Sequence, residues 1–151
     1  MALKIDFGSG HNPKEGYKRC DMTCGPNLDF VYDAEEYKIL DCADESVDEI
    51  WCRNVLHHIP DLKRLFNEFR RVLKVGGSIT IVEPTKEAFD ANICKDYLWY
   101  RFIIPRYDVW YATEYRDYAE DLEKIVGPRT YNDKTEEYET MIFQKENKNV
   151  S

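Results

Sequence analysis

A strand–helix–strand pattern in the middle of the chain constrains the fold more than any other sequence feature. Residues 47–52 have a strand-like pattern and are preceded by turn-forming residues. Asp61 is the predicted N-cap of a helix with apolar residues at helical spacing, and Gly76 and Gly77 are its predicted stop. The β-branched run 78–82 predicts the next strand. Such a unit joins parallel strands through a right-handed crossover, so it predicts an α/β fold.

Segments on either side of this unit add further elements. Residues 3–7 and 28–32 each predict a short strand, so the residue pattern places three strands before residue 53. A second helix is expected over residues 114–126, with Thr113 as its cap and Gly127 at its end.

The carboxyl-terminal segment predicts an antiparallel hairpin at the edge of the sheet. Residues 129–132 and 138–144 are strand-like and are joined by a polar turn. The complete pattern predicts a Rossmann-like, doubly wound, mostly parallel sheet with an antiparallel C-terminal hairpin. A chain of 151 residues suits one domain, which we expect over residues 1–145, followed by a disordered tail at 146–151.

Composition and charge exclude several classes of function. No apolar run approaches the roughly 20 residues that a membrane-spanning helix needs, and residues 1–7 lack the pattern of a secretory signal, which predicts a cytoplasmic protein. The formal net charge of -8 disfavours a nucleic-acid partner, because Lys and Arg supply most affinity for phosphates. The five cysteines are odd in number and lack CxxC spacing, so we expect free thiols and no bound metal.

A glycine-rich turn, residues 6–10, follows the first predicted strand. Ligands of open parallel sheets bind at the carboxyl ends of the strands, where glycine lets a ligand approach the backbone. A G-x-G pattern alone fits a tight turn as well as a ligand site. The dinucleotide fingerprint requires a third glycine where this chain has Pro13, so a nicotinamide oxidoreductase is disfavoured.

Residues of this turn, together with acidic residues further along the chain, form an ordered set. Its members are Asp6, Gly8, Gly10, Asp21, Asp33 and Ala34. Residues 44–60 add a strand and the segment after it, and residues 68–77 add a helix and a turn. The ordered set resembles the class I S-adenosylmethionine-dependent methyltransferases over more than half of the chain. The chain departs from that family around His11 and Asn12, where a third glycine is replaced, and in a shortened N-terminal part.

The resemblance implies S-adenosylmethionine as the cofactor and gives the matching residues roles. Asp6 would receive the ammonium group of the cofactor. Asp21 would accept hydrogen bonds from both ribose hydroxyls, and Asp33 from the adenine amino group. Met22 and Leu56 would form apolar walls. The implied cofactor-binding set is Asp6, Gly8, Ser9, Gly10, Asp21, Met22, Asp33, Ala34, Asn54 and Leu56.

The methyl acceptor is less well defined by the sequence. Methyl transfer from a sulfonium is a direct displacement that needs a base only when the acceptor is weakly acidic. His57, at the carboxyl end of the 47–52 strand, is the first candidate for that base. Aromatic residues are dense from Tyr97 to Tyr118, so residues 85–118 form either a substrate cap, a packed connection or a homodimer interface.

The predicted function is methyl transfer from S-adenosylmethionine to a small-molecule acceptor, such as a metabolite, a sugar or a lipid precursor. The acidic charge supports this class, and the sequence after residue 53 lacks the Pro-Pro-aromatic motif of nucleic-acid amino methylation. The alternative is a non-catalytic module of the same fold that binds S-adenosylmethionine or another protein.

Overall fold

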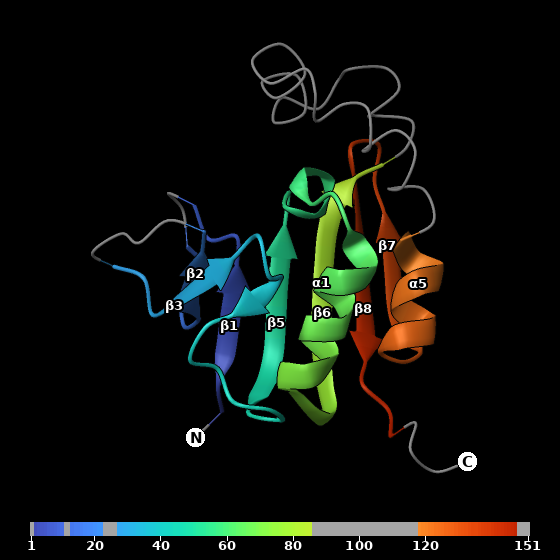
Figure 1. The fold of residues 1–151 in the computed structure, drawn as a ribbon. Helices are drawn as coiled ribbons and strands as arrows, with labels where there is room; N and C mark the ends of the chain where they lie inside the picture. Colours follow the sequence, from blue (N-terminus) through green and yellow to red (C-terminus); the bar gives the residue numbers. More distant parts are fainter. Residues whose placement is uncertain (1, 11–12, 23–26, 86–117, 148–151) are drawn as a thin grey trace.

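The chain folds around a mixed β-sheet that carries helices on one face (Figure 1). The computed structural model describes residues 2–10, 13–22, 27–85 and 118–147. In chain order the elements are β1 (Lys4–Phe7), β2 (Lys18–Asp21), β3 (Phe30–Asp33), β4 (Lys38–Ile39), β5 (Val47–Arg53), the 3₁₀ helix η1 (Leu56–His58), α1 (Leu62–Val72), β6 (Leu73–Pro84), α5 (Tyr118–Ile125), β7 (Arg129–Lys134) and β8 (Tyr138–Gln144).

The described strands lie in the order β4-β3-β2-β1-β5-β6-β8-β7. Neighbours from β3 to β6 run parallel, whereas β4 pairs antiparallel with β3 and β8 pairs antiparallel with β6. The β7–β8 hairpin closes one edge of the sheet. These findings confirm the predicted α/β class, the mostly parallel sheet and the antiparallel C-terminal hairpin.

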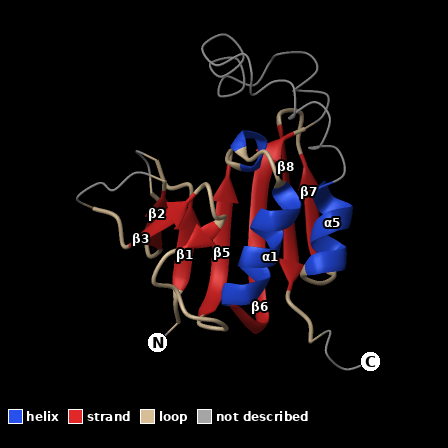
Figure 2. Ribbon diagram, viewed as in Figure 1, coloured by secondary structure: helices blue, strands red, loops and turns tan. Residues whose placement is uncertain are grey.

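Helices α1 and α5 pack side by side on the same face of the sheet (Figure 2). Arg70 in α1 joins them, because its guanidinium donates hydrogen bonds to the carbonyl oxygens of Ile125 (3.2 Å) and Val126 (3.3 Å) at the end of α5. The second helix was expected over residues 114–126. Its described part begins at Tyr118, and residues 113–117 lie outside the described chain.

The aromatic core under α1 fixes the end of β1, where the glycine turn begins. Phe7 is buried, and its ring centre lies 5.0 Å from that of Phe69 in α1 and 4.8 Å from that of Tyr32 in β3. Successive side chains of a strand point to opposite faces, so Asp6 lies on the face away from α1. The core therefore sets which side of the sheet the Asp6 carboxylate reaches.

The carboxyl end of α1 differs from the sequence prediction. The helix ends at Val72, before the two glycines, and β6 begins directly at Leu73. Gly76, with φ of +87°, lies in a bend within the extended segment and does not form the helix stop. The earlier end is stabilised by Lys145, whose Nζ donates to the carbonyl oxygens of Arg70 (2.7 Å) and Leu73 (2.6 Å).

Replacing Lys145 by methionine should lower the free energy of unfolding by about 1–3 kcal/mol, because two carbonyl groups lose a charged donor. Lys145 is buried, so water cannot fully replace that donor. Lys74→Met is the matched control, since Lys74 forms a half-exposed ion pair with Asp48 at 3.2 Å. Such pairs contribute at most about 1 kcal/mol. Urea denaturation of both variants measures the difference, and equal losses would contradict the capping role of Lys145.

Candidate functional site

The candidate site lies where the strand order reverses. From β1 the chain continues through β2 and β3 on one side, then returns to place β5 and β6 on the other side. The crevice at the carboxyl ends of strands on either side of such a reversal is the usual ligand site of an open α/β sheet. The turn after β1 and the segment after β5 therefore form its two walls.

Hydrogen bonds from the glycine turn reach the end of β2. The amides of Gly8 and Ser9 both donate to the carbonyl oxygen of Cys20, at 2.8 and 3.2 Å. The amide of Gly10 donates to the Asp21 carboxylate at 2.9 Å. Both glycines have positive φ, +74° for Gly8 and +54° for Gly10. The turn and the β2 terminus are thus one hydrogen-bonded unit.

Gly8 also allows a close approach between the turn and the segment after β5. A Cβ at this position would lie 2.5 Å from Cγ2 of Val55, closer than carbon atoms pack. The absence of a side chain at Gly8 therefore lets Val55 press against the turn. Val55 lies in the predicted segment after the 47–52 strand, but it was assigned no role there, because its contact with Gly8 crosses between strands and the sequence does not display it.

The acidic residues predicted on β2 and β3 stand at the ends of their strands. The Asp21 carboxylate accepts from Gly10 and also from the amide of Met22 at 2.7 Å, and the Met22 side chain is exposed beside it. Asp33 accepts from the amides of Glu35 (2.9 Å) and Glu36 (3.2 Å), so it also shapes the turn that contains the exposed Ala34.

Asn54 and Leu56 lie on the opposite wall. Asn54 has a left-handed backbone with φ of +55°, and its amide donates to the carbonyl oxygen of Val82 at 2.9 Å. The Leu56 side chain is fully buried in the core. The backbone amide of Leu56 donates a hydrogen bond to the Glu83 carboxylate at 3.1 Å. The structure thus brings Asp6, the glycine turn, Asp21 and Met22 together and places Asn54 across the crevice.

Asp6 is almost fully buried and accepts a hydrogen bond from the amide of Lys14 at 2.7 Å. Burial raises the pKa of its carboxyl above the ordinary value, and the Lys14 amide opposes this shift. A buried carboxylate is unstable without donors, so it provides a strong binding site for a cationic group.

Among the described residues between β1 and β2, which are 8–10 and 13–17, there is no helix. The Lys14 ammonium lies over the ring of Trp51 in β5, 4.2 Å from its centre, and over Tyr17 at 5.5 Å. The Tyr17 hydroxyl donates to Glu49 at 2.7 Å, and burial, together with Glu49, raises its pKa to about 12. These contacts hold the loop on the face away from α1.

Glu83 is a site residue that the sequence reasoning did not select. It lies at the end of β6, is fully buried, and accepts hydrogen bonds from the amides of Val55 (2.8 Å) and Leu56 (3.1 Å). Asp6 was selected through the glycine motif that follows it, whereas Glu83 is followed by Pro84 and Thr85 and has no such motif beside it.

The Ser9 hydroxyl tests whether the turn suits a ligand. Its side chain is buried, yet Oγ has no hydrogen-bond partner within the part of the chain that the structure describes. Buried polar groups normally have a partner, so a polar ligand on the turn would satisfy this hydroxyl. Together with the carboxylates of Asp6 and Asp21, it suits the charged and hydroxyl-bearing cofactor that the resemblance implies.

Several predicted features lie outside the described structure. These are the side chain of His57, all of His11, and the aromatic segment from residue 97 to residue 117. Among the described residues, no group of acidic residues, histidines and cysteines could hold a metal ion. Cys20, Cys42 and Cys52 are free and buried, and burial raises the pKa of each thiol. No described helix is long and apolar enough to cross a membrane.

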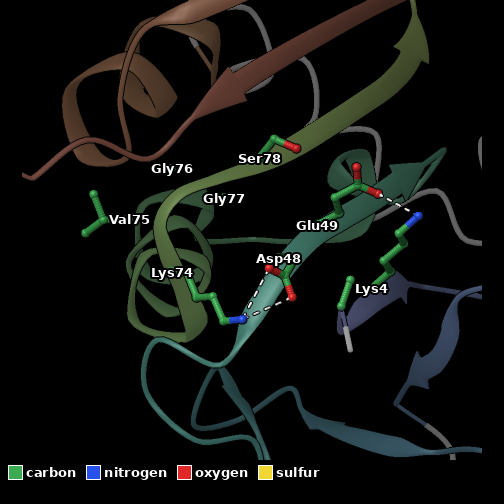
Figure 3. Close-up of a pocket in the computed structure, with 9 residues that line it drawn as sticks. Lys4, Asp48, Glu49, Lys74, Val75, Gly76, Gly77 and Ser78 are labelled. Carbon is green, nitrogen blue, oxygen red and sulfur yellow. Dashed lines mark hydrogen bonds and ion pairs between the residues drawn. The ribbon is translucent and has the colours of Figure 1, made fainter.

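A shallow hollow at the opposite end of the strands is separate from this site (Figure 3). Its charged side chains are already paired, Lys74 with Asp48 at 3.2 Å and Lys4 with Glu49 at 3.7 Å. Because it lies at the amino ends of β5 and β6, it does not contribute to the crevice.

Comparison with known families agrees with this geometry. A family model described as a methyltransferase domain matches residues 13–81, which include β2, β3, β5, α1 and most of β6. Residues 13–81 of the chain thus match a methyltransferase domain of the class I S-adenosylmethionine-dependent type. The matched segment contains Asp21, Asp33 and Asn54.

A curated relative is similar to most of the chain, and solved structures share its fold. The chain is 28% identical to the demethylmenaquinone methyltransferase of Bacillus velezensis over 115 residues, which are 76% of this chain and 45% of that protein. It therefore spans less than half the length of that relative. A Sulfolobus solfataricus protein assigned to the type 11 methyltransferases superposes with a TM-score of 0.64 at 16% identity, over 99% of this chain and 87% of the other.

A second solved structure has the same fold. The S-adenosylmethionine-dependent methyltransferase of Methanosarcina mazei superposes with a TM-score of 0.64 at 17% identity. The superposition covers 95% of this chain and 92% of the other. At these identities the structural likeness establishes the Rossmann-like methyltransferase fold and nothing about the substrate.

Proposed function

We infer that this chain binds S-adenosylmethionine at the carboxyl ends of β1, β2 and β3 and transfers its methyl group to a small-molecule acceptor. The observation that carries this proposal is the polar shell around the glycine turn. It combines the buried Ser9 hydroxyl, which has no hydrogen-bond partner among the described residues, with the buried Asp6 carboxylate and with the Asp21 carboxylate that is hydrogen-bonded to the turn.

Each of these groups has a chemical counterpart in the cofactor. Asp6 is a site for the ammonium group, because a nearby positive charge relieves the cost of ionising a buried carboxylate. Asp21 still has lone pairs for the ribose hydroxyls, since each carboxylate oxygen accepts more than one hydrogen bond. Asp33, Ala34 and Met22 extend the site toward β3, where the adenine would lie. When bound, S-adenosylmethionine supplies a methyl group on a cationic sulfonium.

A small-molecule acceptor is supported by two independent observations. The net charge of -8 disfavours a polyanionic acceptor, and the Bacillus velezensis relative is a demethylmenaquinone methyltransferase. Direct displacement requires mainly that the acceptor atom be held in line with the methyl group. His57, in η1 at the crevice, is the candidate base for an acceptor that must lose a proton.

Adding S-adenosylhomocysteine at about 100 times its Kd should raise the melting temperature by about 5–10 °C, because ligand binding to the native state alone adds about 2.7 kcal/mol. Asp21→Ala should lose most of this shift. Asp133→Ala is the matched control, because Asp133 is exposed in β7 near the opposite sheet edge. A folded wild-type protein that shows no shift at millimolar ligand rules out the cofactor site.

A second candidate function is cofactor binding without turnover. The amides of Gly8, Ser9 and Gly10 already donate to β2, and the described residues between this turn and β2 form no helix whose N-terminus could add donors. Incubation with methyl-labelled S-adenosylmethionine and a small-molecule extract separates the candidates. A labelled product supports methyl transfer, whereas binding without any labelled product supports the non-catalytic module.

A further inference from the structure

Two glutamates are buried in the described structure, and only Glu83 lies at the crevice. Glu68 in α1 is 2% exposed and pairs with Arg71 at 2.7 Å, so its charge is neutralised within the helix layer. Glu83 is 0% exposed, and its Oε2 accepts from two consecutive backbone amides. Burying a carboxylate costs free energy that only strong donors offset, so the two amides must be held firmly in place.

The two amides belong to the turn that follows β5. Asn54 has a left-handed backbone, which costs about 1–2 kcal/mol for a residue with a side chain. The Asn54 amide donates a hydrogen bond to the carbonyl oxygen of Val82 on β6, and the next two amides donate to the Glu83 carboxylate on the same strand. One end of β6 thus fixes three successive amides of the turn, which stabilises its strained conformation.

The turn that follows β5 also fixes one wall of the proposed cofactor site. Its Val55 side chain lies so close to Gly8 that a Cβ there would stand 2.5 Å from Cγ2. If the Val55 amide lost its carboxylate acceptor, the side chain would no longer be held against the glycine turn. A continuous chain of contacts therefore runs from Glu83 through Val55 to Gly8.

We propose that Glu83 is a positioning residue that sets cofactor affinity by holding Val55 against the glycine turn. This inference rests on the proposed function, because the contact between Val55 and the glycine turn sets affinity only if S-adenosylmethionine binds at that turn. The Glu83 carboxylate acts through the backbone of residues 54–56.

Glu83→Gln should raise the Kd for S-adenosylhomocysteine about tenfold, because an amide oxygen is a weaker acceptor for the two backbone amides than a carboxylate. With an active enzyme, the KM for S-adenosylmethionine should rise by a similar factor while kcat changes less than twofold. Glu68→Gln is the matched control, since this buried glutamate also accepts a backbone amide, that of Ile39 at 2.6 Å. It should destabilise the fold yet leave the Kd unchanged.

Val55→Ala provides a second variant if Glu83→Gln folds poorly. It removes the side chain that contacts Gly8, so it should also weaken binding several-fold. The loss in the double variant should be smaller than the product of the two single losses, because both changes break the same chain of contacts. A wild-type Kd in Glu83→Gln or Val55→Ala, or fully multiplicative losses, overturns the proposal.

Nuclear magnetic resonance of the ligand-free protein separates this proposal from the cofactor assignment. Glu83→Gln should shift the amide resonances of Gly8 and Ser9, whereas Glu68→Gln should leave them in place. Unmoved resonances in Glu83→Gln contradict the positioning role even if the wild-type protein binds. Shifted resonances in a protein that binds no S-adenosylhomocysteine support the positioning of the turn and reject the proposed function.

Discussion

Gly8→Ala is expected to lower the free energy of unfolding by about 2–4 kcal/mol and to raise the Kd for S-adenosylhomocysteine at least tenfold. The left-handed φ of +74° accounts for part of the loss, because a Cβ is disfavoured there. The rest comes from the contact with Val55, which must move away from a Cβ at 2.5 Å. Urea denaturation and isothermal titration calorimetry measure the two effects.

Gly16→Ala separates backbone strain from crowding. Gly16 has a comparable φ of +85°, but a Cβ there would meet no atom within 4 Å. We expect a loss of about 1–2 kcal/mol in stability and an unchanged Kd, because Gly16 lies beyond the glycine turn. If Gly8→Ala and Gly16→Ala cost the same and bind equally well, then Val55 does not constrain the turn.

The strand–helix–strand unit could be predicted because its signals are local. Apolar spacing defines α1, and its cap needs only Asp61, whose carboxylate accepts from the Arg64 amide at 3.2 Å. The edge hairpin was predictable for the same reason. The end of α1 was not, because the lysine that satisfies its carbonyl groups follows Leu73 by 72 residues.

The candidate site was predicted in part. Asp6 and Asp21 follow from their places at the strand ends and from the family resemblance, and their roles in binding remain predictions. Strand β4 was missed because it has only two residues, Lys38 and Ile39, and no apolar alternation. Glu83 was missed because its partners are backbone amides, whose positions depend on how β5 and β6 lie together.

Replacing Asp6 by asparagine should separate stability from binding. Burial raises the pKa of Asp6 above its unfolded value, so the ionised carboxylate disfavours the ligand-free fold. Protonated Asp6 contributes to the free energy of unfolding. This contribution is fully present at pH values below the unfolded pKa of Asp6 and is lost as pH rises through its folded pKa. Asp6→Asn should therefore be at least as stable as wild type at pH 7, and its advantage should shrink toward acidic pH.

Asp48→Asn is the control of opposite sign. The pKa of Asp48 is lowered, chiefly by the hydrogen bond from the Leu3 amide, so its ionised form favours the fold. This variant should be less stable than wild type at pH 7, and the difference should vanish as pH falls through the folded pKa. Urea denaturation from pH 3 to pH 8 compares the two variants, and a shared sign would contradict the assignment for Asp6.

Asp6→Asn should at the same time raise the Kd for S-adenosylhomocysteine by about 30-fold or more, because an ammonium group loses a buried carboxylate partner. Asparagine keeps an oxygen for the Lys14 amide, so the loop conformation should persist. In the wild-type protein, affinity should fall at acidic pH as Asp6 takes up a proton, whereas Asp6→Asn should show a flatter profile. Tight binding by a stable Asp6→Asn protein would place the ammonium group elsewhere in the crevice.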